Sequence, residues 1–329
     1  MSRVASRAMP QGPSPFAPSA APLAPGKFAD PLRTADGSER ASVPLVALET
    51  LWFNTGTLCN LTCAGCYIES SPTNDALSYL AAADVTRFLD EIEGDSLPTR
   101  EIGFTGGEPF MNPEIIRMLE LALSRRFEVL VLTNAMKPMR RHEAALLALR
   151  AKHGPRLNLR VSLDHHTPTV HEAERGANTW TVALDGLRWL GNHGFSIAVA
   201  GRLLPGESEA KARTGYRDLF AMQGIAIDAN DPARLVLFPE MDSGADIAEI
   251  TTDCWQILGK SPADVMCATS RMVVHRKGEP APRVAACTLL PYDPQFDVGG
   301  TLREASGAVQ LNHPHCARFC VLGGASCSA

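Results

Sequence analysis

Residues 48–67 read LETLWFNTGTLCNLTCAGCY, an apolar run from Leu48 to Phe53 that leads into three cysteines. The run is short and rich in strand-forming residues, which predicts a β-strand. Cys59, Cys63 and Cys66 then lie on the loop after its carboxyl end. In parallel βα barrels this end of the strands is the functional face. The stretch therefore predicts an α/β fold with a thiol-rich functional loop after its first strand.

Strand-like and helical patterns alternate along the chain that follows. Repeated βα units indicate a parallel sheet, and six units can be counted. In the fourth strand Arg160, Ser162 and Asp164 share one face, and Val161 and Leu163 share the other. A polar inner face suits a barrel open enough to hold a ligand, so we expect a partial (βα)6 TIM-like barrel. The predicted strands are 48–53, 101–105, 129–133, 157–163, 196–203 and 234–238, and the predicted helices are 82–93, 113–125, 142–152, 179–193 and 209–223.

Composition divides the 329 residues into three predicted parts. Residues 1–45 are rich in Pro and Ala and have no periodic apolar face, which predicts a disordered tail. Residues 46–239 carry the βα rhythm and form the predicted barrel. Residues 240–329 hold six of the nine cysteines and are too short for a large core, so we expect a small cysteine-rich C-terminal domain.

Charge and hydropathy exclude two classes of partner. The net charge of -5 leaves no excess of Lys and Arg for a nucleic-acid backbone. No apolar stretch approaches membrane-spanning length, and no signal-peptide core follows the first arginines. We therefore expect a cytoplasmic protein without a nucleic-acid or membrane partner. In a reducing compartment clustered cysteines more often bind metals than form disulfides.

The three clustered thiols at Cys59, Cys63 and Cys66 predict an iron-sulfur centre. Three thiolates within eight residues can bind three irons of a [4Fe-4S] cluster and leave the fourth iron open for a ligand. Structural zinc normally binds four protein ligands in a closed site, and no further cysteine or histidine lies nearby in the sequence. Zinc and free thiols remain the alternatives.

This C-x3-C-x2-C spacing, together with Gly-Gly-Glu-Pro at 106–109, resembles the radical-SAM superfamily, with most likeness to its peptide-maturase and molybdopterin-precursor branches. The resemblance implies a [4Fe-4S] cluster that cleaves S-adenosylmethionine (SAM) to a 5′-deoxyadenosyl radical. Relatives carry an aromatic residue before the third cysteine where this chain has Gly65, and Tyr67 is the predicted replacement. The SAM-binding residues that the resemblance implies are Gly106, Gly107, Glu108, Pro109, Asn134, Ser162 and Arg202, with Glu108 at the SAM amine and Arg202 at its carboxylate.

The C-terminal cysteines surround a predicted hairpin, with a β-like run at 272–275, a turn at Lys277-Gly278 and a second run leading into Cys287. This resembles the twitch and SPASM extensions of the same superfamily, which implies an auxiliary [4Fe-4S] cluster. Zinc, with His313 or His315 beside it, and reduced thiols are the alternatives. Cys254 has no assigned role. The predicted ligands are drawn from Cys267, Cys287, Cys316, Cys320 and Cys327.

Two functions of different classes compete. The first is a radical-SAM enzyme that receives electrons from a flavodoxin or ferredoxin and acts on a peptide, a protein or a small metabolite. The second is an electron-transfer or SAM-binding protein without radical chemistry. The Gly-Gly-Glu-Pro motif favours the enzyme, because an electron carrier needs no site for the SAM amine. Residues expected at the barrel mouth, where substrate binds, are Asp164, His165, His166 and Glu240.

Overall fold

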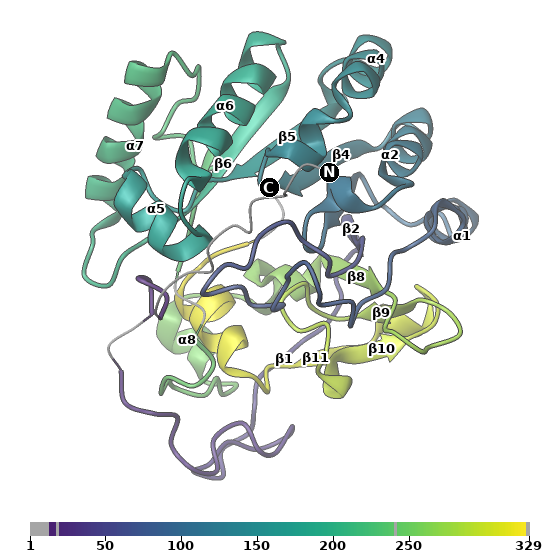
Figure 1. Ribbon diagram of the computed structural model, residues 1–329. Helices are drawn as coiled ribbons and strands as arrows, with labels where there is room; N and C mark the ends of the chain where they lie inside the picture. Colours follow the sequence, from purple (N-terminus) through teal and green to yellow (C-terminus); the bar gives the residue numbers. More distant parts are fainter. Residues whose placement is uncertain (1–12, 18–19, 240–241, 327–329) are drawn as a thin grey trace.

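The structure is a computed structural model that describes residues 13–17, 20–239 and 242–326. Its strands are β1 (Ser42–Val43), β2 (Thr50–Asn54), β3 (Glu101–Thr105), β4 (Glu128–Thr133), β5 (Leu157–Ser162), β6 (Ser196–Arg202), β7 (Leu235–Phe238), β8 (Ser270–Val274), β9 (Arg283–Ala285), β10 (Asp297–Gly299) and β11 (Val309–Gln310). Within the described residues, nine of these strands form one sheet in the order β10-β9-β8-β2-β3-β4-β5-β6-β7 (Figure 1).

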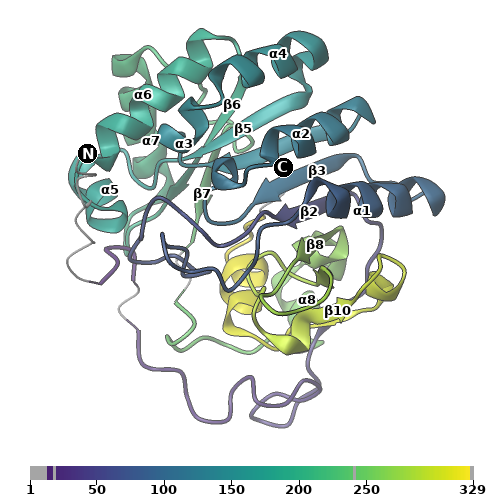
Figure 2. The same cartoon turned by 45° about the vertical axis from the view of Figure 1, so that its right-hand side comes forward.

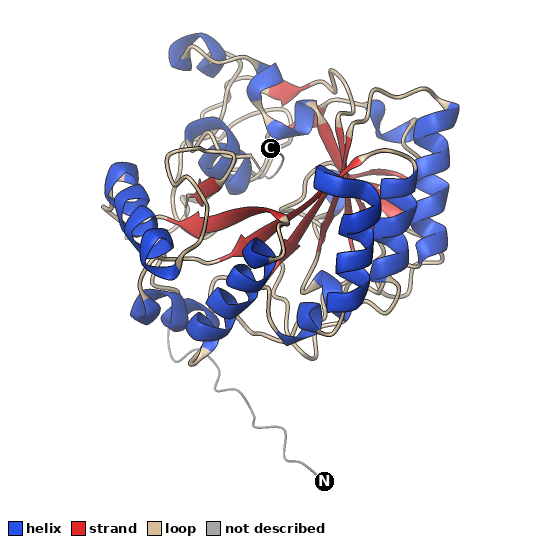
Figure 3. Cartoon of the chain, turned by 90° about the horizontal axis from the view of Figure 1, so that it is seen from above, coloured by secondary structure: helices blue, strands red, loops and turns tan. Residues whose placement is uncertain are grey.

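Helices connect the strands and cover the outer face of the sheet (Figure 3). The longest, α7, has 15 residues, and no helix in the described part of the chain is long and apolar enough to span a membrane. The helices are α1 (Ala82–Gly94), α2 (Ile115–Ser124), α3 (Lys137–Arg140), α4 (Glu143–His153), α5 (Pro168–Arg175), α6 (Thr179–Asn192), α7 (Glu209–Gln223), α8 (Cys254–Leu258) and a π-helix (Cys316–Leu322).

Strands β2 to β7 lie side by side in chain order and all pair in parallel. This arrangement confirms the predicted α/β class and the six βα units of a partial barrel, because both edges of the sheet stay open. The six predicted strands agree with the observed ones to within two residues. Helices α3 and α5 were not predicted, since both are short and begin beside a proline instead of on a long apolar period.

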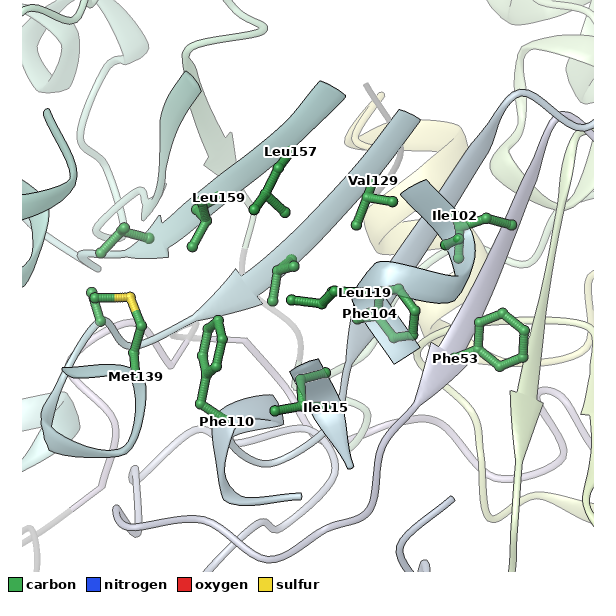
Figure 4. Close-up of a cluster of buried hydrophobic side chains, with 14 of the residues drawn as sticks. Phe53, Ile102, Phe104, Phe110, Ile115, Leu119, Val129, Met139, Leu157 and Leu159 are labelled. Atoms are coloured by element: carbon green, nitrogen blue, oxygen red, sulfur yellow. The ribbon is translucent and has the colours of Figure 1, made fainter. Parts of the chain in front are cut away.

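The main hydrophobic core lies between the sheet and the outer helices. Phe53 and Phe104 stack across neighbouring strands with ring centroids 5.6 Å apart, and the edge of Phe88 from α1 meets Phe53. Figure 4 shows Ile102, Val129 and other strand residues pointing into the same cluster. Burying such side chains contributes about 1.5–3 kcal/mol each, which fixes the sheet register that the site depends on.

The C-terminal segment covers the opposite face of the sheet (Figure 2). Trp52 from β2 and Leu130 from β4 belong there to one buried cluster with Met272 and Phe319. The predicted hairpin is present as β8 and β9, but β8 also pairs in parallel with β2 over Thr50–Phe53. Strands β8 to β10 of the C-terminal segment therefore extend the sheet of the predicted barrel.

The prediction of a disordered tail over 1–45 is wrong for the described part of that segment. Phe16 is fully buried, and β1 pairs with β11 near the end of the chain. Arg40 and Glu249 form a nearly fully buried ion pair at 2.5 Å. Each of these contacts joins residues more than 180 positions apart, so no local pattern of apolar residues predicts them.

Candidate active site

A cavity opens where β2 to β7 end, and every one of the last five of these strands contributes residues to its wall. Cys59, Cys63 and Cys66 line it together, as the sequence predicted. Of the seven predicted SAM-binding residues, Glu108 and Pro109 do not line the cavity, although both are buried. The wall residues from the strand ends and the loops after them include Thr105, Gly106, Gly107, Leu132, Thr133, Asn134, Ser162, Asp164, Ala200, Arg202, Phe238 and Pro239.

Backbone amides of the cysteine loop after β2 donate to two of its sulfurs. The amide of Leu61 donates to the Cys59 sulfur at 3.4 Å, and the amide of Ser70 donates to the Cys66 sulfur at 3.3 Å. Burial raises the pKa of the Cys59 thiol to about 12, and the Glu108 carboxylate adds to the shift. Burial also raises the pKa of Cys63. A thiolate is therefore costly here unless a cationic group binds it.

The paired glycines let the loop after β3 lie directly on the segment that leads to the cysteines. The amides of Gly107 and Glu108 donate to the carbonyls of Gly56 and Leu58 at 2.8 and 3.1 Å. A Cβ on Gly107 would lie 2.3 Å from the Leu58 oxygen, and Gly106 has φ of +140°. The missing Cβ atoms thus let this loop approach the backbone of residues 56–58 closely, while both glycines also face the cavity.

Glu108 joins two loops of the site. Its Oε1 accepts from the Thr133 hydroxyl at 2.8 Å and the Phe110 amide at 3.2 Å, and its Oε2 accepts from the Asn134 amide at 2.8 Å. Burial raises the pKa of Glu108 to about 7, although these hydrogen bonds oppose the shift. The carboxylate therefore fixes the end of β4 against the loop after β3.

Asn134 extends this network to the cysteine loop. Its side-chain amide donates to Oδ1 of Asn60 at 3.0 Å, and its Oδ1 accepts from the backbone of Met136. Asn60 lies between the first two cysteines in the sequence. The predicted ligand-contacting residue Asn134 thus also positions the thiols.

Asp164 and Arg175 form a buried pair in the cavity wall. The guanidinium of Arg175 donates to both carboxylate oxygens, at 2.6 and 3.2 Å. Burial alone would raise the pKa of Asp164, but the charge of Arg175 and its hydrogen bonds outweigh that effect and lower it. Sequence reasoning placed Asp164 at the barrel mouth and missed Arg175. The Thr167-Pro168 start of α5 was the available signal.

Glu174, also missed from the sequence, lies at the centre of a second network. Its Oε1 accepts from the Gly65 amide at 2.8 Å and pairs with Arg202 at 3.0 Å, and its Oε2 accepts from the Ser14 hydroxyl at 2.7 Å. The Arg202 guanidinium also lies 4.4 Å above the Phe16 ring. These groups occupy the space that a side chain at position 65 would need, which explains the glycine there.

A second cavity lies within the C-terminal segment. Four of the predicted ligands line it together, namely Cys267, Cys287, Cys316 and Cys320. Burial raises the pKa of Cys316 well above its usual range, and the charges of Cys287 and Cys267 add to the shift. Leu289 lines both this cavity and the first one.

The remaining predicted residues have separate locations. His315 lines the second cavity, and His313 lies against its ring at 4.6 Å between centroids. Cys254 lines neither cavity, and its sulfur lies 3.5 Å from the Thr251 hydroxyl. His165 and His166 lie beside Glu207, outside both cavities. Cys327 and Glu240 lie outside the described residues.

Comparisons with solved structures support the fold. The structure superposes on Streptococcus suis SuiB bound to S-adenosylmethionine with a TM-score of 0.55 at 14% identity, covering 78% of this chain and 63% of that one. Against anSMEcpe with bound AdoMet the TM-score is 0.54 at 14% identity, covering 78% of this chain and 76% of the other. At these identities the likeness concerns the fold alone.

Sequence comparisons identify the family. AlbA, the antilisterial bacteriocin subtilosin biosynthesis protein of Bacillus subtilis, is 31% identical over 168 residues, which are 51% of this chain and 35% of that protein. The mycofactocin maturase MftC of Mycobacterium ulcerans is 29% identical over 140 residues, 43% and 36% of the two chains. The GTP 3',8-cyclase of Streptomyces coelicolor is 31% identical over 163 residues, 47% and 44%.

The matched regions thus span less than half the length of these curated relatives. A model of the Radical SAM superfamily matches residues 53–218, just over half of the chain. That range contains the three cysteines of the first cavity and the ends of β3, β4, β5 and β6, four of the five strands that form its wall. This chain belongs to the Radical SAM superfamily.

Proposed function

We propose that this chain is a radical-SAM enzyme that holds a [4Fe-4S] cluster on Cys59, Cys63 and Cys66 and SAM in the adjoining cavity. The observation that carries the proposal is that these three thiols face one cavity together with Gly106 and Gly107, at the carboxyl ends of parallel strands. When bound, a reduced cluster and SAM together supply a 5′-deoxyadenosyl radical that removes a hydrogen atom from a substrate.

The donor atoms fit an iron-sulfur cluster better than a single zinc ion. Tetrahedral zinc, with Zn–S bonds of about 2.3 Å, holds its sulfurs about 3.8 Å apart. Among the described residues, no three cysteine or histidine donors of either cavity lie within 4.8 Å of one another. The wider spacing suits a cluster whose irons bind separate thiolates. The irons of a cluster would supply the positive charge that stabilises these buried cysteines, whose pKa values are raised, as thiolates.

The residues around the thiols hold the site in place. Glu108 and Asn134 tie the ends of β3 and β4 to the cysteine loop, and Glu174 holds that loop through the Gly65 amide. For binding SAM we propose Gly106, Gly107, Asn134, Ser162 and Arg202, which line the cavity, with Tyr67 beside the adenine. The contact of Glu108 with the SAM amine stays a proposal that rests on the Gly-Gly-Glu-Pro motif, since Glu108 does not line the cavity and its two oxygens already accept three hydrogen bonds.

The C-terminal cavity supports an auxiliary [4Fe-4S] cluster. Cys267, Cys287, Cys316 and Cys320 supply the four thiolates that a fully ligated cluster requires. With these four, neither Cys254 nor Cys327 is needed as a ligand. Leu289 lines both cavities, which supports the proposal that an auxiliary cluster would lie next to the proposed radical site.

A peptide or protein is the substrate class that we propose. Two of the relatives are named for the biosynthesis of a bacteriocin and the maturation of mycofactocin. The GTP 3',8-cyclase relative favours a small metabolite as the second candidate. A flavodoxin or ferredoxin is the proposed electron donor.

SAM cleavage after anaerobic reconstitution tests the main proposal. The protein reduced with dithionite should form 5′-deoxyadenosine from SAM, and Cys63→Ala should abolish this product. Cys254→Ala is the matched control, because Cys254 lines neither cavity and should retain activity. No product from the reconstituted protein would favour an electron-transfer role, and full product from Cys63→Ala would exclude the assigned cluster site.

Iron analysis tests the auxiliary site separately. Two clusters require about eight irons per chain. A variant lacking Cys59, Cys63 and Cys66 should retain about half of the iron, held by the C-terminal thiolates. If that variant retains none after reconstitution, the second cavity holds zinc or reduced thiols instead.

A further inference from the structure

A cluster of metal-binding side chains outside both cavities has no role in the proposed reaction. His165 and His166 follow the end of β5, and Glu207 lies in the loop before α7. One nitrogen of each histidine and one Glu207 oxygen all lie within 4.8 Å of one another. His165 is only 3% exposed, and the Glu207 side chain is 4% exposed.

The polar atoms of this cluster lack the partners that buried groups normally have. His165 Nε2 and His166 Nδ1 are buried and make no hydrogen bond to any described residue. His165 Nε2 lies 3.4 Å from the Glu207 Oε2, the separation of a long ion pair. A buried polar group without a partner costs about 1–3 kcal/mol, so two orphaned nitrogens at one place need an explanation.

We propose that His165, His166 and Glu207 bind a divalent transition-metal ion such as zinc. Two imidazoles and one carboxylate are a common protein ligand set for these ions, with water completing the shell. The 3.4 Å between Nε2 and Oε2 is a separation that a shared metal can span. Binding a metal through Nε2 requires the proton of His165 on Nδ1, where it would donate to the Thr167 hydroxyl at 2.9 Å and displace the Thr167 amide that donates to Nδ1 at 3.1 Å.

The surroundings are compatible with a bound cation. Burial lowers the pKa of both histidines, which keeps their imidazoles neutral and able to bind a metal near pH 7. Glu207 supplies one negative charge, and Asp218 lies close enough to act on His166, while Lys211 opposes them. The rest of the coordination shell would be neutral water.

Neighbouring groups pack closely on both imidazoles. The two imidazole rings stack with centroids 4.0 Å apart, and His166 lies edge-on to Tyr216 of α7 at 5.6 Å. A Cβ on Gly215 would lie 2.4 Å from the His166 ring, so the helix packs directly on that imidazole. A metal at this place would join the loop after β5 to the loop before α7, one residue from Asp164 in the cavity wall.

A simpler arrangement of the same groups is a buried His165–Glu207 pair without metal, in which Nδ1 accepts the Thr167 amide at 3.1 Å. That arrangement leaves the buried Nδ1 of His166 without a partner. A shared metal accounts for both imidazoles, and the two arrangements differ in whether the protein retains zinc.

Zinc binding to the reconstituted protein tests the proposal, because assembled clusters keep the cysteines from binding the added ion. After reconstitution and removal of loose metal, the protein is equilibrated with Zn²⁺, desalted and analysed for zinc content and by zinc K-edge absorption. We expect about one zinc per chain, with nitrogen and oxygen neighbours at about 2.0–2.1 Å and no sulfur at about 2.3 Å.

Variants identify the ligands. Glu207→Gln keeps the shape of the side chain and should weaken zinc binding by more than about tenfold, as should the double variant His165→Gln, His166→Gln. His193→Gln, at an exposed histidine on the end of α6, should bind zinc like the parent protein. Zinc should also raise the unfolding temperature of the parent but not of Glu207→Gln.

Three results would overturn the proposal: no retained zinc, a sulfur neighbour shell, or equal zinc affinity in the parent and Glu207→Gln. Circular dichroism checks that each variant folds. If the double variant does not fold, the zinc affinity of Glu207→Gln by itself tests the proposal. None of these readouts depends on SAM cleavage, and the iron content of the reconstituted protein shows before zinc is added whether the clusters that occupy the cysteines have assembled.

Discussion

Replacing Gly107 with alanine should break the support of the cysteine loop. The added Cβ would lie 2.3 Å from the Leu58 oxygen and 2.6 Å from the Thr57 oxygen, where ordinary contact begins at 3.4 Å. The two backbone segments would therefore have to separate by about 1 Å. Overpacking costs about 1–3 kcal/mol, and each of the two hydrogen bonds to residues 56 and 58 contributes about 1 kcal/mol. We expect Gly107→Ala to lower the free energy of unfolding by about 2–5 kcal/mol.

Urea unfolding and iron analysis measure the two consequences. The displaced segment leads directly to Cys59, so reconstituted Gly107→Ala should lose iron from the first site and keep that of the C-terminal site. Gly94→Ala is the matched control, because it is exposed at the end of α1 and its added Cβ meets no atom within 4 Å. If the two variants show the same unfolding free energy and iron content, the close packing of these loops does not support the cluster.

Three further predictions concern buried polar groups. Glu174→Gln removes the partner of Arg202 at positions 2% and 12% exposed and should cost about 3 kcal/mol in urea unfolding; an unchanged midpoint would contradict this. Thr133→Val removes a donor to Glu108 and should cost about 1–3 kcal/mol, again by urea unfolding, and a neutral result would show that Glu108 needs no such donor. Burial lowers the pKa of His171 to about 4, so the folded state binds fewer protons than the unfolded state below pH 6.5. Stability should therefore fall between pH 6.5 and 4, by about 2 kcal/mol at pH 5 from this group, and an undiminished pH dependence in His171→Gln would refute the assignment.

The order of strands and helices followed from the sequence because each was a local pattern. Alternating short β-rich runs and amphipathic stretches predicted β2 to β7 to within two residues. The position of the three thiols at the carboxyl edge of the sheet followed from the same reasoning, since the loop after a strand begins at the carboxyl end of that strand. The hairpin β8–β9 was likewise readable from two runs separated by a turn.

What the sequence did not determine are contacts between distant residues. The parallel pairing of β8 with β2 joins segments about 220 positions apart, and the burial of Phe16 beside Arg202 joins segments 186 positions apart. Glu174 and Arg175 lie on a polar helix of only eight residues, so their roles appear only when α5 packs beside the cysteine loop.

The sequence alone thus indicated the kind of chemistry, because thiols, glycines and carboxylates at fixed local spacings indicate which cofactors they can bind. Only the tertiary structure decided which groups act together. It assembled four of the C-terminal cysteines around one cavity, joined Glu108 to two strand ends and brought Glu207 to His165. The physical reason is that ligand sets form between loops whose distance is fixed by the packing of the sheet and its helices, and packing is a property of the whole chain.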